Sequence, residues 1–135
     1  MIPRPSDSNE LLSFVRDWFH LISVDRWEEA CASIDRPNCY GIIWTPALIR
    51  EAIDLAFPPG CIFRSQHPEA LQITEPLSAS GRAYGDVIEM DTPPGYSVEL
   101  SVPLNGEWSD LTAQFEFMHH SDDTLLVCLH GLHVL

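Results

Sequence analysis

The stretch 96–118, YSVELSVPLNGEWSDLTAQFEFM, decides the fold because two alternating apolar runs flank a single turn signal. Side chains alternate between the two faces of a β-strand, so each run predicts a strand with one apolar face. Asn105-Gly106 between the runs is a typical hairpin turn signal. We therefore expect an antiparallel hairpin whose apolar positions are Tyr96, Val98, Leu100, Val102 and Leu104 on one strand and Leu111, Ala113, Phe115 and Phe117 on the other.

The register of this hairpin follows from the requirement that both apolar sets share one face. Only a pairing of even-numbered residues in the first strand with odd-numbered residues in the second satisfies it. We expect Leu104 to lie opposite Leu111, and Leu100 to lie opposite Phe115.

On the polar face, the expected register sets Glu99 directly opposite Glu116. Like charges at opposite positions cost stability unless something compensates them. Two interpretations stay open: both glutamates extend into solvent, or this strand face binds a partner rich in arginine or lysine. The residues predicted to form such a binding surface are Glu99, Glu107, Asp110, Gln114 and Glu116.

Further strands are expected on both sides of the hairpin. Segments near 71–77, 84–91 and 125–135 have strand-like composition and are separated by Gly, Pro, Asn and Asp signals. The short apolar run CYGIIW, 39–44, predicts one small additional strand.

Three amphipathic helices are expected before the main run of strands. The first starts at Asp7, with Glu10 three residues later in an arrangement that resembles a capping box. The second begins near Asp25, and the third follows Thr45-Pro46, an N-cap residue with proline at the first helical position. Helices followed by meandering strands indicate an α+β fold with three N-terminal helices packed on an antiparallel sheet.

The totals of the sequence limit the function classes. A chain of 135 residues is expected to form a single domain, 1–135. Twenty acidic residues face seven arginines and no lysine, which gives a net charge of −13. Such a charge repels phosphate backbones, so nucleic-acid binding is disfavoured, and it attracts a basic protein partner.

No signal-peptide pattern opens the chain, and no apolar run approaches the ~20 residues of a membrane helix. A soluble, cytoplasmic protein with no membrane partner is therefore expected.

Cysteine and histidine spacings do not predict a metal site, and we expect no cofactor. No C-x-x-C pair exists among Cys31, Cys39, Cys61 and Cys128, so free thiols are expected. A Cys128–His130 nucleophile pair has no evident third group to orient it. Strand parity disperses the closing histidines over both faces of the last hairpin: His119, His120, His130 and His133.

Three residues are candidates for acid–base catalysis. Asp86 shares a strand face with Tyr84, so it is a candidate pocket carboxylate with a phenolic partner. His20, at the polar edge of the first helix, is expected to approach from the other side. The alternative interpretation is a strand-end aspartate in water.

A small apolar ligand is the expected occupant of an apolar pocket beneath the helices. The residues expected to line this pocket are Trp18, Phe19, Trp27, Trp44, Tyr96 and Phe115.

Three helices followed by a strongly curved antiparallel sheet, with the chain ending in a long central strand, resemble the nuclear-transport-factor-2-like fold, a cone-shaped α+β architecture. The resemblance covers Glu10 to Leu135 and rests on element order. It implies either an enzyme, as in ketosteroid-isomerase-like and polyketide-cyclase-like proteins and dehydratases, or a non-catalytic binding or dimerisation module. The enzymes of this fold use an acidic or histidine base inside the cone.

A second, local resemblance concerns the closing segment. GEWSDLT at 106–112 and LHGLHVL at 129–135 resemble a small uncharacterised bacterial family with an S-D-L-T turn and a terminal H-V-L.

Two functions are therefore expected. The first is a non-catalytic acidic interaction protein, of the bacterial immunity type, that binds a basic partner such as a toxin domain. The alternative is a small-molecule-binding protein or an isomerase-, cyclase- or dehydratase-like enzyme that uses the apolar cone pocket. A homodimer formed through the sheet is expected under either function.

Overall fold

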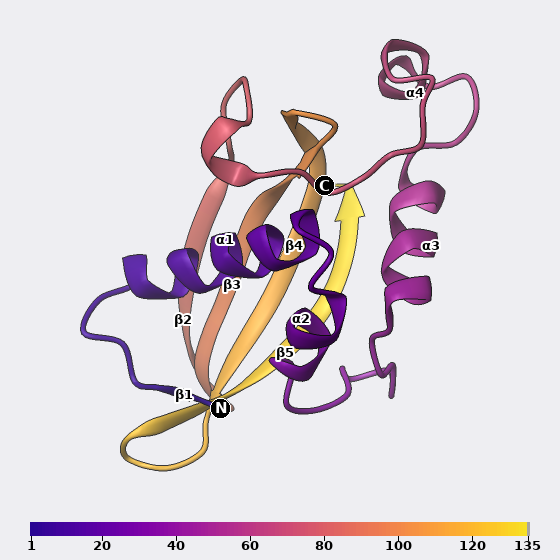
Figure 1. The fold of residues 1–135 in the computed structure, drawn as a ribbon. Coiled ribbons are helices and arrows are strands. Elements are labelled where there is room, and N and C mark those ends of the chain that lie inside the picture. Colours follow the sequence, from indigo (N-terminus) through magenta and orange to yellow (C-terminus); the bar gives the residue numbers. More distant parts are fainter. Residues whose placement is uncertain (135) are drawn as a thin grey trace.

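A computed structural model describes residues 1–134 (Figure 1), and within them an open five-stranded antiparallel sheet accompanies four α-helices. The α+β class is confirmed, with strand order β1-β5-β4-β3-β2. No helix in these residues has the length and apolarity needed to cross a membrane. The elements are β1 (Ile2–Pro3), α1 (Asn9–Ser23), α2 (Trp27–Ala32), α3 (Pro46–Ala56), α4 (Ile62–Gln66), the 3-10 helix η1 (Pro76–Ser78), β2 (Gly85–Asp91), β3 (Pro94–Leu104), β4 (Glu107–His119) and β5 (Thr124–Val134).

The first predicted helix is confirmed as α1, which crosses in front of the sheet in Figure 1. Two local carboxylates stabilise its start. Glu10 accepts a hydrogen bond from the Ser6 N–H (3.0 Å), and Asp7 accepts one from the Asn9 N–H (2.8 Å). The buried residues of α1 recur at helical spacing, so they form one stripe along the helix: Leu11, Val15, Trp18, Phe19 and Ile22.

The second and third predicted helices are also confirmed, as α2 and α3. The Thr45 hydroxyl accepts a hydrogen bond from the Leu48 N–H (3.3 Å), and Pro46 occupies the first turn. Ile49 and Ile53 are the buried residues of α3, which contacts β5. The short helix α4, after the Pro58-Pro59-Gly60 break, was not predicted.

The strand predicted at 39–44 is wrong, because this segment forms a loop. The side-chain oxygen of Asn38 accepts hydrogen bonds from the N–H groups of Tyr40 (3.0 Å) and Ile42 (2.9 Å). A side chain that binds its own following backbone in this way competes with strand pairing.

The strand predicted at 71–77 is also wrong. This segment meets the sheet only as an isolated bridge, Ile73 opposite Leu104, within the described residues. It then enters η1 at Pro76, whose ring cannot donate to a strand ladder. The predicted strand at 84–91 is confirmed as β2, and that at 125–135 is confirmed as β5 except for Leu135, which lies outside the described residues.

The central hairpin turns where predicted, but its register differs. Asn105 and Gly106 both have positive φ angles, 50° and 88°, the combination that a tight two-residue hairpin turn requires. Leu104 therefore lies opposite Glu107 and not opposite Leu111.

An irregularity next to this turn then shifts the pairing by two residues, between Ser101 and Pro103 of β3. The Ser109 hydroxyl donates to the Val102 carbonyl (2.6 Å) and accepts from the Leu111 N–H (3.2 Å). The Ser109 side chain thus supplies hydrogen-bond partners to backbone groups at the point where the regular pairing of β3 and β4 is interrupted.

Beyond the irregularity, Val98 lies opposite Phe115 and Leu100 opposite Ala113, so the predicted pairing of Leu100 with Phe115 is wrong. Because a shift of two residues is one full strand period, the parity of the hairpin is unchanged. Both apolar sets share one face, as predicted, and their residues at these positions are buried.

The interior between α1 and the sheet is filled by aromatic rings. Phe14 of α1 makes edge-on contacts with Phe115 and Phe117, at centroid distances of 6.0 and 5.4 Å. Trp18 contacts Phe115 in the same way, at 5.3 Å. Such edge-to-face packing leaves no room between helix and sheet at these positions.

The border of the sheet formed by β5 is covered by groups from distant parts of the chain. β1 pairs with the first two residues of β5. Asp35 then donates its backbone N–H to the Val127 carbonyl and accepts the Val127 N–H at its carboxylate, both at 2.8 Å. The Trp44 indole N–H donates to the Leu129 carbonyl (2.7 Å). From Thr124 to Leu129, this edge is therefore closed to further strand pairing.

Candidate functional site

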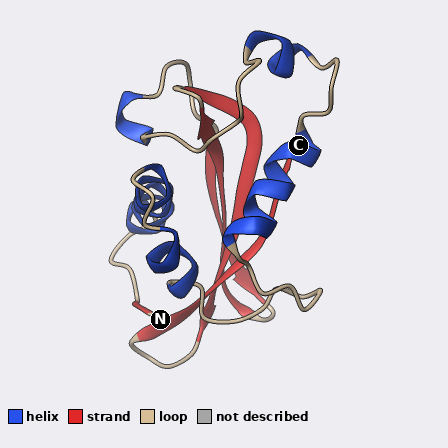
Figure 2. Ribbon diagram, turned by 45° about the vertical axis from the view of Figure 1, so that its right-hand side comes forward, coloured by secondary structure: helices blue, strands red, loops and turns tan. Residues whose placement is uncertain are grey.

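The sheet has two different faces. α1 packs on the side that bears Leu100 and Phe115, and Figure 2 shows α1 and α2 standing together on one side of the strands. The opposite side, which we call the outer face, is assigned from strand register. Its residues are Tyr84, Asp86, Ile88 and Met90 along β2, Ser97, Glu99 and Ser101 in β3, Thr112, Gln114, Glu116 and Met118 in β4, and Leu126, Cys128, Gly131 and His133 in β5.

The middle of the outer face is built from small polar side chains. Ser97, Ser101 and Thr112 are buried beneath their larger neighbours, with at most 9% of their surface exposed. The Gln114 amide donates to the Ser97 hydroxyl (3.3 Å) and crosses from β4 to β3. The centre is therefore a polar floor, and the carboxylates project around it.

Asp86 and Glu99 occupy adjacent positions of β2 and β3 on this face. The Tyr84 hydroxyl donates to the Glu99 carboxylate (3.5 Å). Partial burial, and then the negative charges of Glu99 and Asp86, raise the pKa of Tyr84 above its ordinary value. Within residues 1–134 neither carboxylate forms an ion pair, so their charge is not neutralised locally.

Glu116, the third carboxylate, lies opposite Ser97 and not opposite Glu99, so the predicted head-on pair of glutamates is wrong. Gln114 takes the place opposite Glu99, which makes the two glutamates diagonal neighbours. Glu116 contacts His130 Nδ1 at 3.4 Å, and both side chains are about 30% exposed.

Cys128 lies at the β5 end of the outer face, beneath the loop that follows α2. The Cys128 thiol donates to the Pro37 carbonyl (3.6 Å), and burial raises its pKa to about 11, with the Glu116 charge contributing. A thiol held protonated in this way is a poor nucleophile.

The Cys–His contact in the structure is a different one from the Cys128–His130 pair that the sequence argues against. It joins the exposed Cys39 to His130, with 3.8 Å between Sγ and Nδ1. Glu116 and Cys39 thus both approach Nδ1 of His130. In a catalytic relay, the nucleophile binds one ring nitrogen of the histidine and the orienting carboxylate binds the other.

The two remaining predicted binding residues, Glu107 and Asp110, lie near the turn end of β4, and no register pair joins them to Asp86, Glu99 or Glu116. Glu107 lies beside the hairpin turn, where its carboxylate is 3.3 Å from His67 Nε2. Asp110 is exposed in the irregular part of β4. Of the five residues predicted to bind a partner, Glu99, Gln114 and Glu116 form one surface.

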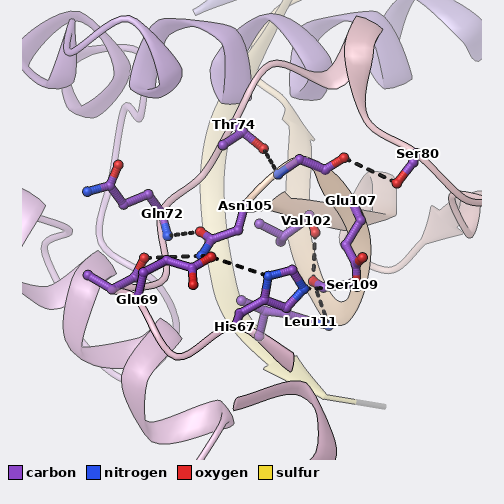
Figure 3. A network of polar contacts seen from close by, with 12 residues as sticks. His67, Glu69, Gln72, Thr74, Ser80, Val102, Asn105, Glu107, Ser109 and Leu111 are labelled. Atoms are coloured by element: carbon purple, nitrogen blue, oxygen red, sulfur yellow. Dashed lines mark hydrogen bonds and ion pairs between the residues drawn. The ribbon is translucent and has the colours of Figure 1, made fainter. Parts of the chain in front are cut away.

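His67 belongs to a polar network that sequence reasoning missed (Figure 3). Its side chain is 13% exposed, and its two ring nitrogens face Glu69 (3.5 Å) and Glu107 (3.3 Å). Hydrogen bonds from the Glu69 backbone and the Asn105 amide lower the pKa of Glu69, and His67 adds to this. These residues are distant in sequence and share no motif, so no spacing could have indicated the network.

The three candidate catalytic residues do not meet. His20 forms an ion pair with Glu75 and lines a cleft of about 400 Å³ beside Leu77. Tyr84 and Asp86 point to the outer face, because Gly85 between them faces Leu12 of α1. The predicted approach of His20 to Asp86 is therefore absent.

The six residues predicted to line one apolar pocket serve different purposes. Trp18, Phe19 and Phe115 are at most 1% exposed and fill the core. Trp44 covers the β5 edge, Trp27 lies under the Arg50 guanidinium (4.6 Å), and Tyr96 is near the His119 ring (6.1 Å).

Within residues 1–134, no three His, Cys, Asp or Glu side chains are grouped so that they could hold a metal ion. The closing histidines have separate surroundings: Glu116 beside His130, and Tyr96 near His119.

Comparisons with protein-family models, curated proteins and solved structures find no match to this chain. The resemblance to nuclear-transport-factor-2-like proteins therefore stays a prediction.

Proposed function

We propose that this protein is a non-catalytic interaction protein whose outer face binds a basic partner. The observation that supports this most is the grouping of Asp86, Glu99 and Glu116 on one sheet face opposite α1. Asp86 and Glu99 lack ion pairs within the described residues, so their charge is available to a partner's arginines.

The physical properties of the face fit such a partner. A net charge of −13 steers a basic protein towards the molecule and speeds encounter at low salt. Guanidinium groups form paired hydrogen bonds with carboxylates. Ile88, which is 50% exposed, and the partly buried Met118 add apolar contact area at the border of the face.

The finer proposal is an immunity-type role, in which the partner is a basic toxin domain of bacterial origin. Its test is stoichiometric inhibition of a basic toxin domain encoded beside this gene. We also propose the cone-shaped architecture, which the order of the elements supports. A homodimer formed through the sheet is a further proposal, and the apolar positions of the outer face support it.

The main experiment measures binding of an arginine-rich peptide by fluorescence anisotropy. In the face variant, Asp86→Asn, Glu99→Gln and Glu116→Gln are combined. We expect it to bind at least about tenfold more weakly than the natural protein at low salt, because three charge-assisted contacts are lost. Added salt should weaken binding to the natural protein.

The matched control variant combines Asp17→Asn, Glu28→Gln and Glu51→Gln, three exposed residues of the helices. It loses the same charge at other places and should bind the peptide nearly as well as the natural protein. Equal losses in both variants would mean that only net charge matters, and would contradict the proposal.

A second candidate function, binding of a small organic anion, is favoured by one observation. A cleft of about 450 Å³ between α1, α3 and the segment 70–73 is lined by Trp27 and Arg50, and also by Asp25 and Asp54. The guanidinium stacked on the indole offers a charge for a carboxylate and an aromatic surface beside it. Calorimetry with benzoate tests this: we expect binding that Arg50→Gln abolishes and Arg16→Gln preserves.

A further inference from the structure

The two borders of the sheet are treated differently. Along β5, distant groups cover the outward backbone as far as Leu129. β2 forms the opposite border (Figure 1), and within residues 1–134 no other segment bonds to its outward backbone groups. Proteins usually protect such an edge, because it is a template for pairing with another chain.

The register identifies which groups of β2 face outward. The Ser101 N–H donates to the Tyr84 carbonyl (2.8 Å), so Tyr84 directs its carbonyl towards β3. In an antiparallel pair the direction alternates along the strand. The N–H and C=O groups of Gly85, Val87 and Glu89 therefore point away from the sheet.

The side chains of this edge select against self-pairing. Asp86, Glu89 and Asp91 are all exposed on one seven-residue strand. If two copies paired through β2, each would bring three carboxylates to the shared border, and this concentration of like charge is destabilising. An arginine- or lysine-rich strand would bring opposite charges to the same positions.

We propose that the edge of β2 binds an extended basic segment of the partner as a sixth strand. This rests on the proposed function and names its binding mode: backbone hydrogen bonds supply affinity, and alternate side chains supply specificity. Basic residues of the segment would lie beside Asp86 and Glu89, and an apolar residue beside the half-exposed Ile88.

The first test uses a peptide of about ten residues in which pairs of arginines and pairs of valines alternate. Because side chains alternate between the two faces of a strand, one register of this peptide places arginine beside both Asp86 and Glu89 and valine beside Ile88. Its control has the same sequence with N-methylated valine amides, which keep the charge and remove half of the backbone donors that face β2. We expect the control to bind roughly tenfold more weakly or worse, because several backbone hydrogen bonds are lost.

The second test follows amide hydrogen exchange by NMR in the natural protein. On saturation with the unmodified peptide, the Gly85, Val87 and Glu89 amides should exchange at least about tenfold more slowly, because they gain partners. The Asp86 and Ile88 amides face β3 already and should change little, so they serve as an internal control.

Two substitutions of Glu89 distinguish the contribution of its side-chain charge to peptide binding from that of its backbone N–H. Glu89→Gln removes the charge only, whereas Glu89→Pro also removes the outward donor, a replacement that edge strands tolerate. We expect Glu89→Pro to bind the unmodified peptide at least about fivefold more weakly than Glu89→Gln.

The outcomes distinguish the two proposals. Equal affinity for both peptides, or unchanged exchange at Val87 and Glu89, overturns edge pairing. If the face variant still loses affinity in that case, the proposed function stands. Absence of binding to either peptide at low salt overturns both proposals. The exchange measurement needs no substitution, so misfolding of a variant cannot obscure the result.

Discussion

At Gly95, β3 runs so close to β4 that a side chain has no space. An added Cβ would lie 2.3 Å from the Phe117 carbonyl oxygen and 3.1 Å from the Met118 Cα. We expect Gly95→Ala to lower the free energy of unfolding by about 1–3 kcal/mol, because backbone atoms must move apart. Urea denaturation measures this.

Gly131 of β5 is the matched control for Gly95. An added Cβ there would have its nearest neighbour, His133 Nδ1, at an ordinary 3.6 Å. Gly131→Ala should leave the free energy of unfolding nearly unchanged or raise it slightly. Equal destabilisation by both substitutions would contradict the steric explanation.

Cys128 should make stability fall at alkaline pH. Burial, then Glu116, raise its pKa from 9.0 to about 11, so the folded state holds the thiol proton more tightly than the unfolded state. A raised pKa leaves stability intact below the unfolded value and reduces it as pH rises from there to the folded value. We expect the loss between about pH 9 and 11 in urea denaturation.

Cys128→Ala should reduce this alkaline loss of stability, because the thiol with the larger rise in pKa is gone, whereas Cys31, whose pKa burial also raises, keeps a smaller part of it. Cys61→Ala is the control, and it should retain the full loss. An identical pH profile for the natural protein and Cys128→Ala would show that another group is responsible.

At the scale of elements, the two edges of the sheet are the main contrast. β5 is closed by a two-residue strand, a carboxylate and an indole, all contributed from earlier in the chain. β2 has charged side chains in place of such cover. The bonds to β5 also fix the segment between α2 and α3 against the sheet.

Trp44→Phe tests the importance of this cover. It leaves the Leu129 carbonyl, in a fully buried residue, without the indole donor, and should cost about 1–3 kcal/mol of unfolding free energy. Trp108→Phe is the control, because Trp108 is partly buried and its indole N–H makes no hydrogen bond within residues 1–134. Similar costs for both would mean that lost packing, not the hydrogen bond, is responsible.

At the scale of the whole molecule, charge should govern self-association. A two-fold homodimer through the outer face would bring the Asp86, Glu99 and Glu116 carboxylates of two copies together. We therefore expect sedimentation velocity to detect monomer at low salt and more dimer at high salt, where repulsion is screened. The face variant should dimerise at lower salt than the natural protein, and a dimer that salt dissociates would contradict this.

Several features of the molecule were predictable from sequence because they depend on local periodicity. The alternation in 96–104 and 111–117 specifies which residues share a face, and the helical spacing that follows Asp7 specifies α1. Thr45-Pro46 marks the start of α3 for a local reason, a hydroxyl that caps backbone donors. The grouping of Glu99, Gln114 and Glu116 follows from the same parity.

Other features needed the tertiary structure, because they depend on groups far apart in the chain. Parity shows that Tyr84 and Asp86 share a face, but only the packing of α1 decides that this face is the outer one. The register changes at an irregular position where the Ser109 hydroxyl donates to the Val102 carbonyl, a contact that joins two strands.

The sequence alone therefore determined the α+β class, the charge of −13 and which residues of β3 and of β4 share a face. Only the tertiary structure decided that the helix-facing side is filled by aromatic rings, that β5 is covered and that β2 is open. The physical reason is that side-chain alternation is local, whereas burial and edge pairing depend on which distant segments come into contact.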